Sequence, residues 1–231
     1  MATGAPGTNG VWQYGEDDSE ATFSALLNKA ASTTDTQIGA DRTRLDALEA
    51  RKLSGFVPIV PSSVTVSGGT ATVNSTGAVI LGSGITSISL NGVFTSTYNQ
   101  YRIVLDLKTT VSGGTSTRFR FRKSGTDRTT GYYGSTFGTY FSGSAIQVEN
   151  RSNGADGWAG HYGTDEGICE IDISPLLNSM KYNLNHYSIP IGAAFLGGYS
   201  TNATGGADGF TIYPSTGSFT SGNIKVYGYV G

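Results

Sequence analysis

The chain has 231 residues, of which 14% are charged, and its formal net charge is −2. This balance excludes a broad basic surface for nucleic acid or for an anionic membrane. No stretch approaches the ~20 apolar residues of a membrane-spanning helix, so we expect no membrane insertion. No basic start precedes an apolar run, so we expect no signal peptide and synthesis in a cytoplasm. The 34 glycines, 13 tyrosines and 10 phenylalanines are typical of a β-rich protein with many turns.

Residues 1–18 are mostly small or polar and show neither a helical nor a strand period. We therefore expect an extended arm. Three large side chains, Val11, Trp12 and Tyr14, stand out within it. Isolated aromatic residues on such an arm are suited to anchoring in a pocket of another protein. The alternative is that they pack on the helix that follows.

Residues 19–54 are predicted to form a helical stalk. Asp18 or Ser19 can cap its first turn, while Gly55 and Pro58 stop it at the other end. The run at residues 32–34 consists of weak helix formers, which favours a break into two helices.

Apolar or small residues recur along the stalk with heptad spacing, at Leu27, Ala31, Ile38, Leu45 and Leu48. Such a stripe fits a helix that packs on copies of itself, because one helix cannot bury it alone. We predict a coiled coil of two or three chains. Asp41 and Lys52 interrupt the seam, and an alternative is a helix lying on its own β region.

Residues 55–91 are predicted to form a β-hairpin neck. Within this stretch, residues 62–74 read as a hairpin with Gly68 and Gly69 in the turn. The strands are rich in Ser and Thr and have little to bury. We therefore expect several copies of the chain to share one narrow core.

Residues 92–231 carry a higher density of strand patterns. Tyr101, Ile103, Leu105 and Leu107 recur with a period of two and share one face of a predicted strand. Further strands are predicted around Phe119, Ile146, Cys169, Tyr182, Ala193, Phe210 and Ile224. Residues 174–177 read as a single helical turn. The fold class is therefore mainly β, with an antiparallel, jelly-roll-like β-sandwich as the C-terminal head.

The single cysteine, Cys169, excludes an intrachain disulfide. It lies in the apolar phase of residues 169–173, and no histidine or basic residue adjoins it in the sequence. We predict a buried, small hydrophobic side chain in place of a reactive thiolate.

The best candidate for a binding site is the glycine-spaced segment 153–167. Its aromatic rings and nearby carboxylates are Trp158, His161, Tyr162, Asp156 and Asp165. Flat rings beside hydrogen-bond acceptors are what a sugar ring needs. We predict a glycan-binding site here. The alternative is that Trp158 and Tyr162 are ordinary core or interface residues.

The sequence contains no motif for catalysis or for a cofactor. A glycosidase needs two facing carboxylates, for which Asp156, Asp165, Glu166 and Glu170 are candidates without known geometry. His161 with Asp165 and Glu166 matches no metal-ligand template. We expect a protein that is not an enzyme and that binds neither a metal nor a cofactor.

Three arginines, Arg118, Arg120 and Arg122, alternate with apolar residues and share one face of a predicted strand. Such a row could bind acidic sugars or phosphates. The interpretation we favour is a solvated face, or pairing with acids across a subunit boundary. The row also guards the strand against edge pairing.

Three stretches carry a resemblance to a known group of proteins. They are residues 9–29 (NGVWQYGEDDSEATFSALLNK), residues 94–105 (FTSTYNQYRIVL) and residues 224–229 (IKVYGY). The chain resembles minor tail proteins and tail fibres of phages that infect Gram-positive, mainly actinobacterial, hosts. The likeness covers both ends and much of the middle, and no catalytic or binding motif transfers with it.

The resemblance implies a homotrimer located in the virion, with an N-terminal attachment arm, a coiled-coil stalk and a head that touches the host wall. Val11, Trp12 and Tyr14 would then anchor the arm on other virion proteins. The partner of the head would be a host cell-surface polysaccharide. The alternatives are a head-mounted decoration fibre, a purely structural scaffold that binds only virion proteins, and a polysaccharide depolymerase.

Overall fold

A computed structural model describes residues 20–52, 55–140, 146–176, 179–188, 192–202 and 205–230. The predicted arm, with Val11, Trp12 and Tyr14, lies outside the described residues. The chain divides into two compact units, Met1–Ser54 and Gly55–Gly231.

The first unit contains one continuous helix, α1 (Glu20–Lys52). The expected break at residues 32–34 is wrong. The hydroxyls of Thr33, Thr34 and Thr36 each donate to the carbonyl four residues earlier, at 2.8–2.9 Å. Thr is a weak helix former partly because its hydroxyl can bond the backbone in non-helical conformations. Here the hydroxyls bond carbonyls of the helix itself, so the helix continues through these residues.

The predicted seam residues of α1 that can be placed are exposed. Leu27 has 50% and Ile38 has 47% of its surface accessible, and Ala31 is also exposed. The side chains of Leu45 and Leu48 lie outside the described set. The apolar residues are also spread around the helix without a strong amphipathic face. The coiled coil and the trimer therefore stay predictions.

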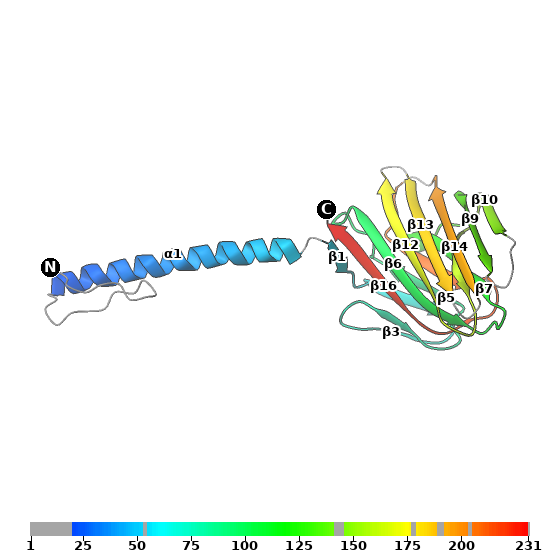
Figure 1. Cartoon of the computed structure of the whole chain (residues 1–231), viewed down its shortest axis with the longest axis horizontal. Helices are drawn as coiled ribbons and strands as arrows, with labels where there is room; N and C mark the ends of the chain where they lie inside the picture. The colour runs from blue at the N-terminus through cyan, green and yellow to red at the C-terminus, as the bar shows by residue number, and fades with distance from the viewer. Residues whose placement is uncertain are drawn as a thin grey trace. The chain divides into compact units, whose positions relative to one another are not determined.

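The second unit consists of two antiparallel sheets (Figure 1). The larger sheet has the order β10 (Ile146–Gly154), β9 (Tyr132–Tyr140), β14 (Ala193–Thr201), β13 (Ser179–Ser188), β12 (Gly167–Leu176), β6 (Gln100–Thr109), β16 (Phe219–Val230), β4 (Val79–Leu81) and β3 (Ala71–Val73). Strand β1 (Gly55–Pro58) also pairs with β16. The smaller sheet has the order β11 (Gly157–Tyr162), β7 (Thr115–Lys123), β15 (Gly209–Pro214), β5 (Ser87–Asn91) and β2 (Ser63–Ser67), and β8 (Thr126–Asp127) pairs with β7.

The core lies between these sheets and follows the predicted alternation. Tyr101, Ile103, Leu105 and Leu107 on β6 are all buried. From the smaller sheet, Phe119 is buried as well, and its ring centroid lies 5.0 Å from that of Tyr182 on β13. Burying one face of each sheet against the other supplies the hydrophobic stabilisation. The prediction of a mainly β, antiparallel sandwich is confirmed.

The predicted neck at residues 55–91 is wrong, because this segment is part of the sandwich. Strands β2 and β5 pair in the smaller sheet, and β3 and β4 pair in the larger one. Gly68 and Gly69 form a corner between the sheets, with positive φ angles of 68° and 56°. A Cβ at either position would lie 2.3 Å from a backbone oxygen, of Gly84 or Ser83. The two glycines therefore serve a close crossing of chains.

The helical turn predicted at residues 174–177 is also wrong over its described part. Strand β12 continues to Leu176, with Pro175 opposite Met180 and Leu176 opposite Ser179 on β13. The long antiparallel pairing with β13 outweighs the local Ser-Pro signal.

Candidate functional site

A pocket of about 280 Å³ opens between the two sheets near the free edge of β10. Strands β9, β10 and β14 of the larger sheet face β7 and β11 of the smaller sheet here. The lining residues are Ser116, Thr136, Tyr140, Gln147, Val148, Glu149, Trp158, His161 and Phe195. We call this the inter-sheet pocket.

Aromatic rings form one part of the inter-sheet pocket. The indole of Trp158 is only 3% exposed and packs edge-on against Phe195, with 5.0 Å between centroids. Tyr140 and His161 are half-buried and lie nearer to solvent, with centroids 5.7 Å apart and rings nearly perpendicular. Trp158 thus forms a buried part of the wall, while Tyr140 and His161 offer accessible ring surface to a ligand.

Polar groups form another part of the lining. Glu149 on β10 forms ion pairs with Arg118 on β7 and with Arg151, the latter at 2.6 Å. The two guanidinium groups hold the carboxylate in place and compensate its charge. Gln147, two residues earlier on the same strand, adds an amide to the lining. These fixed donors and acceptors suit the hydroxyl groups of a polar, uncharged ligand.

His161 lines the pocket, and the buried His186 lies next to it. The backbone N–H of His161 donates to Nε2 of His186 at 3.3 Å, so the proton of the neutral His186 ring sits on Nδ1. Burial, followed by the nearby His161, lowers the pKa of His186 to about 4. Burial also lowers the pKa of His161. Both rings are therefore neutral at pH 7, and neither adds a positive charge to the pocket.

The structure brings two of the predicted glycan-binding residues, Trp158 and His161, to the inter-sheet pocket. Tyr162 lies elsewhere: it is fully buried, and its hydroxyl donates to the Ala159 carbonyl at 3.1 Å. The expectation that Tyr162 presents a face to a sugar is wrong in this structure. Nearly every residue of the short strand β11 is buried. The glycine-rich sequence around it is typical of a loop and gives no sign of this burial.

The two predicted carboxylates do not line the inter-sheet pocket either. Asp156 accepts a hydrogen bond from the Tyr213 hydroxyl at 2.5 Å and lies 3.6 Å from Arg151 and 3.8 Å from Arg120. These partners make Asp156 a structural residue that ties β15, β7 and β10 together. Asp165 is exposed, outside the residues that line the pocket.

Sequence reasoning missed Tyr140, Gln147 and Glu149. A usable signal exists on β10, because a period of two places Ile146 and Val148 on one face of the strand. By register, Gln147 and Glu149 lie opposite Gly138 and Thr136 and project to the pocket side, although Gln147 is exposed at the sheet edge. Ile146 and Val148 project to the other side and are 72% and 60% exposed, and Val148 also borders the pocket at this edge. Apolar character alone therefore gave the wrong face of this edge strand.

The arginine row is paired with acids, as expected, but the partners belong to the same chain. Arg118 pairs with Glu149 and Arg122 with Asp127, which lies on the neighbouring strand β8. Arg120 lies 4.7 Å from the centre of the Tyr213 ring. The arginines therefore tie β7 to β10 and to β8 within one chain.

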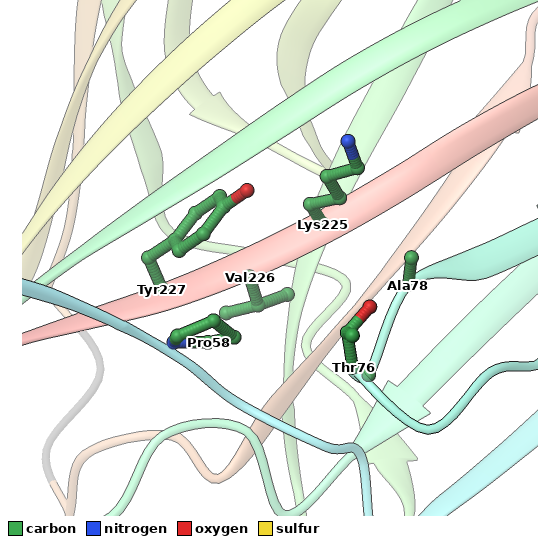
Figure 2. A pocket seen from close by; sticks show the side chains of 7 residues that line it. Pro58, Thr76, Ala78, Lys225, Val226 and Tyr227 are labelled. Atoms are coloured by element: carbon green, nitrogen blue, oxygen red, sulfur yellow. The ribbon is translucent and has the colours of Figure 1, made fainter.

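A second, smaller pocket of about 140 Å³ lies beside β16, where β1 and β4 both pair with that strand (Figure 2). Figure 2 shows Tyr227 and Lys225 on β16, with Pro58 and Thr76 on segments that run next to it. Its lining contains one aromatic ring and no carboxylate. The inter-sheet pocket is larger and richer in hydrogen-bonding groups, so we take it as the candidate site.

Within the described residues, no group of three or more His, Cys, Asp or Glu side chains is placed to hold a metal ion. No helix in the described part of the chain combines the length and apolar character needed to cross a bilayer.

No protein-family model matches the sequence, and no curated protein matches it. Among solved structures, the CBM2 module of the evolved Dit of Lactobacillus casei BL23 phage J-1 has 8% identity and a TM-score of 0.26, with 75% of this chain and 94% of that chain covered. The enzymatically active domain of bacteriophage CBA120 tailspike protein 2 has 11% identity and a TM-score of 0.30, covering 75% and 30%.

A variant of the GH43 protein BlXynB from Bacillus licheniformis has 13% identity and a TM-score of 0.32. The match covers 67% of this chain and 33% of that one, so the chain spans about a third of its length.

Proposed function

We propose that the chain is a structural component of a phage tail fibre whose β unit binds host cell-surface glycan in the inter-sheet pocket. The observation that carries this proposal is the lining of that pocket. Accessible rings of Tyr140 and His161 lie beside Glu149 and Gln147, which is the combination a sugar ring requires. The sequence resemblance to phage tail proteins supports the virion location.

The electrostatics of the inter-sheet pocket favour a neutral sugar over a strongly acidic one. Glu149 contributes a carboxylate, and its two arginine partners already bind it. An anionic ligand would have to compete with Glu149 for those arginines. A neutral sugar can instead donate its hydroxyls to Glu149 and to the amide oxygen of Gln147. At about 280 Å³ the pocket holds a short segment of a polysaccharide, such as a single residue and its linkage.

We further propose that binding occurs without catalysis. Among the described residues that line the inter-sheet pocket, Glu149 is the one carboxylate. Hydrolysis of a glycosidic bond by the usual route needs a second carboxyl group facing the first.

The virion role includes self-association and attachment. We propose that α1 forms a parallel bundle, a homotrimer in the arrangement that the resemblance implies. The exposed Leu27 and Ile38 support association, because an isolated helix with exposed apolar residues is marginal in water. Residues 1–18, with Val11, Trp12 and Tyr14, would attach the assembly to other virion proteins.

Binding of the full chain to purified cell walls and to wall polysaccharides of candidate hosts tests the glycan proposal. The informative variant is Tyr140→Ala, because Tyr140 is half-buried and lines the inter-sheet pocket. We expect at least ~10-fold weaker binding, equivalent to about 1.4 kcal/mol. Trp158→Ala is a poorer choice, since removing a buried Trp costs about 3–5 kcal/mol of stability.

The matched control is Tyr133→Ala. Tyr133 lies on the same strand, β9, but on the exposed outer face. It should bind glycan like the unmodified chain. Equal loss in both variants, or no binding by the unmodified chain to any host envelope, would contradict the proposal.

A second candidate function is a purely structural fibre or head decoration that binds only other virion proteins. The exposed apolar side chains on the outer face of the larger sheet favour it, since such residues suit a protein contact. Binding to virion proteins together with no glycan binding would select this function.

A further inference from the structure

The outer face of the larger sheet carries a continuous group of exposed apolar residues. Figure 1 shows its strands β10, β9, β14, β13 and β12 side by side. The residues project from these strands with 48–72% of their surface accessible: Ile146, Val148, Phe137, Leu196, Tyr187 and Ile168. We call this group the outer apolar patch.

Strand register shows that the outer apolar patch is contiguous. Val148 lies opposite Phe137, and Phe137 lies opposite Leu196, so these three form one cross-strand row. In the neighbouring row, Tyr187 lies opposite Ile168. Cross-strand neighbours have Cβ atoms about 4.5–5.5 Å apart, so their side chains touch. Thr139 and Ala194 lie between Ile146 and Tyr187, and neither is charged. The first row continues from Leu196 to Asn185 and ends at the charged Glu170 on β12, which limits the patch on that side.

This composition is unusual for a sheet face in water. An antiparallel sheet that covers a core on one side normally alternates apolar residues inward with polar residues outward. The same sheet follows that rule further along, where Arg102 forms a bidentate pair with Asp172 on its outer face. The outer apolar patch is therefore a local departure, and it fits a surface that is covered in the assembled protein.

The exposed area of the outer apolar patch indicates whether it can bind a free protein or only a partner that is already held nearby. At roughly 100 Å² for each half-exposed large side chain, the six residues expose roughly 600 Å². A stable complex between free proteins buries about 800 Å² on each partner. The patch is slightly too small for such a complex, but it is sufficient when the partner is already held nearby.

The chain itself provides such a tether. Helix α1 ends at Lys52 and strand β1 starts at Gly55. If the helices of different copies associate, this short connection in each chain keeps the β units of those copies close to one another. A short tether gives a millimolar effective concentration. We propose that the outer apolar patch packs against the β unit of a neighbouring copy in the same oligomer. This inference rests on the self-association proposed above and is independent of glycan binding.

The edge of the sheet argues for packing through the face and against pairing of edges. Strand β10 ends the described sheet order, yet its Glu149 and Arg151 point inward and are bound in ion pairs. Inward-pointing charges on an edge strand are a device that prevents addition of another strand. A neighbouring copy therefore meets the apolar side chains, while the backbone of β10 stays free of intermolecular pairing.

Cysteine labelling of the full chain tests this inference. Cys169 is buried and its thiol pKa is raised by burial, so it stays silent toward a bulky maleimide. Leu196→Cys places a thiol in the outer apolar patch. Ile80→Cys is the matched control, because Ile80 is 42% exposed on β4 of the same sheet, and Leu196 is 48% exposed. In the oligomer we expect Leu196→Cys to react at least ~10-fold more slowly than Ile80→Cys, since labelling requires the contact to open.

A second variant connects the protection to packing of the patch. Phe137→Glu, added to Leu196→Cys, places a charge next to the thiol and should restore fast labelling while the circular dichroism spectrum stays unchanged. Slow labelling that persists in this variant would overturn the inference. If light scattering shows an oligomer and Leu196→Cys and Ile80→Cys are labelled at equal rates, the packing of the patch is wrong while the self-association stands. Equal rates in a monomer would overturn the proposed self-association as well.

Discussion

His186 is the residue whose environment departs most from that of a histidine in water. It is 1% exposed and sits among the rings of Trp158, Tyr162 and Phe195. Its Nε2 accepts the hydrogen bond from the His161 backbone. A buried imidazole that accepts a hydrogen bond is held in its neutral form, and protonation would place an uncompensated charge in the core.

This environment predicts that the fold loses stability in mild acid. The pKa of His186 is about 4 in the folded chain and takes the ordinary value of about 6.5 when unfolded. Between these values the unfolded chain binds a proton that the folded chain does not, so the free energy of unfolding falls as the pH falls. From pH 7 to pH 5 we expect a loss of about 2 kcal/mol, measured by urea unfolding at the two pH values.

The control for this prediction uses two histidine variants. His186→Asn cannot titrate, so its free energy of unfolding should change much less between pH 7 and pH 5, and His161, whose pKa is also lowered by burial, supplies part of what remains. His161→Asn keeps His186 and should retain most of the pH dependence. If His186→Asn shows the full dependence, another group is responsible.

At the scale of the element, α1 provides the test of self-association. Ile38 is 47% exposed and lies on the predicted seam. Ile38→Glu places a charge where copies are predicted to meet, so we expect at least a 10-fold larger dissociation constant, or about 1.4 kcal/mol. Sedimentation or light scattering of the full chain over a range of concentrations measures it.

The control for the seam lies on the same helix. Thr33 is exposed, off the predicted seam, and its hydroxyl donates to Lys29 of its own helix. Thr33→Glu introduces the same charge and should leave the mass of the assembly unchanged. An equal effect of both variants would show that net charge, and no specific seam, governs association.

The elements that the sequence predicted well are those whose signal is local. Tyr101 to Leu107 alternate over a full strand, and Phe119 alternates with arginines, so both strands and their buried faces were predictable. Pairing was harder. Gly68 and Gly69 signal a sharp turn equally well for a hairpin and for a corner between sheets, and the difference depends on strands distant in sequence.

The candidate site shows the same limit. The aromatic segment around Trp158 pointed to the right part of the chain, but Tyr140, Gln147 and Glu149 come from strands that no spacing rule connects to it. The burial of Tyr162 depends on packing beneath the larger sheet, where its ring lies 5.0 Å from that of His186. Side-chain type suggests a chemistry, and only the sheet order decides which side chains meet.

At the scale of the whole molecule, the two units differ in what stabilises them. The β unit has a continuous core of buried side chains between its sheets, which stabilises it within one chain. Helix α1 is about 50 Å long by its ~1.5 Å rise per residue, and its described side chains are mostly exposed. Its stability should therefore come from other copies of the chain.

The two units should consequently unfold in separate thermal transitions that respond differently to concentration. Helix signal at 222 nm should be lost first, and a hundredfold dilution should lower its midpoint, because mass action weakens each association step by about 2.7 kcal/mol. The near-ultraviolet signal of buried tyrosines such as Tyr101 and Tyr182 should report a later transition with a smaller concentration dependence. If the outer apolar patch packs on another copy, it causes the remaining concentration dependence of the later transition. Phe137→Glu should therefore remove this concentration dependence. A single coincident transition that ignores dilution would mean that α1 is stabilised within its own chain, and the self-associating stalk would be wrong.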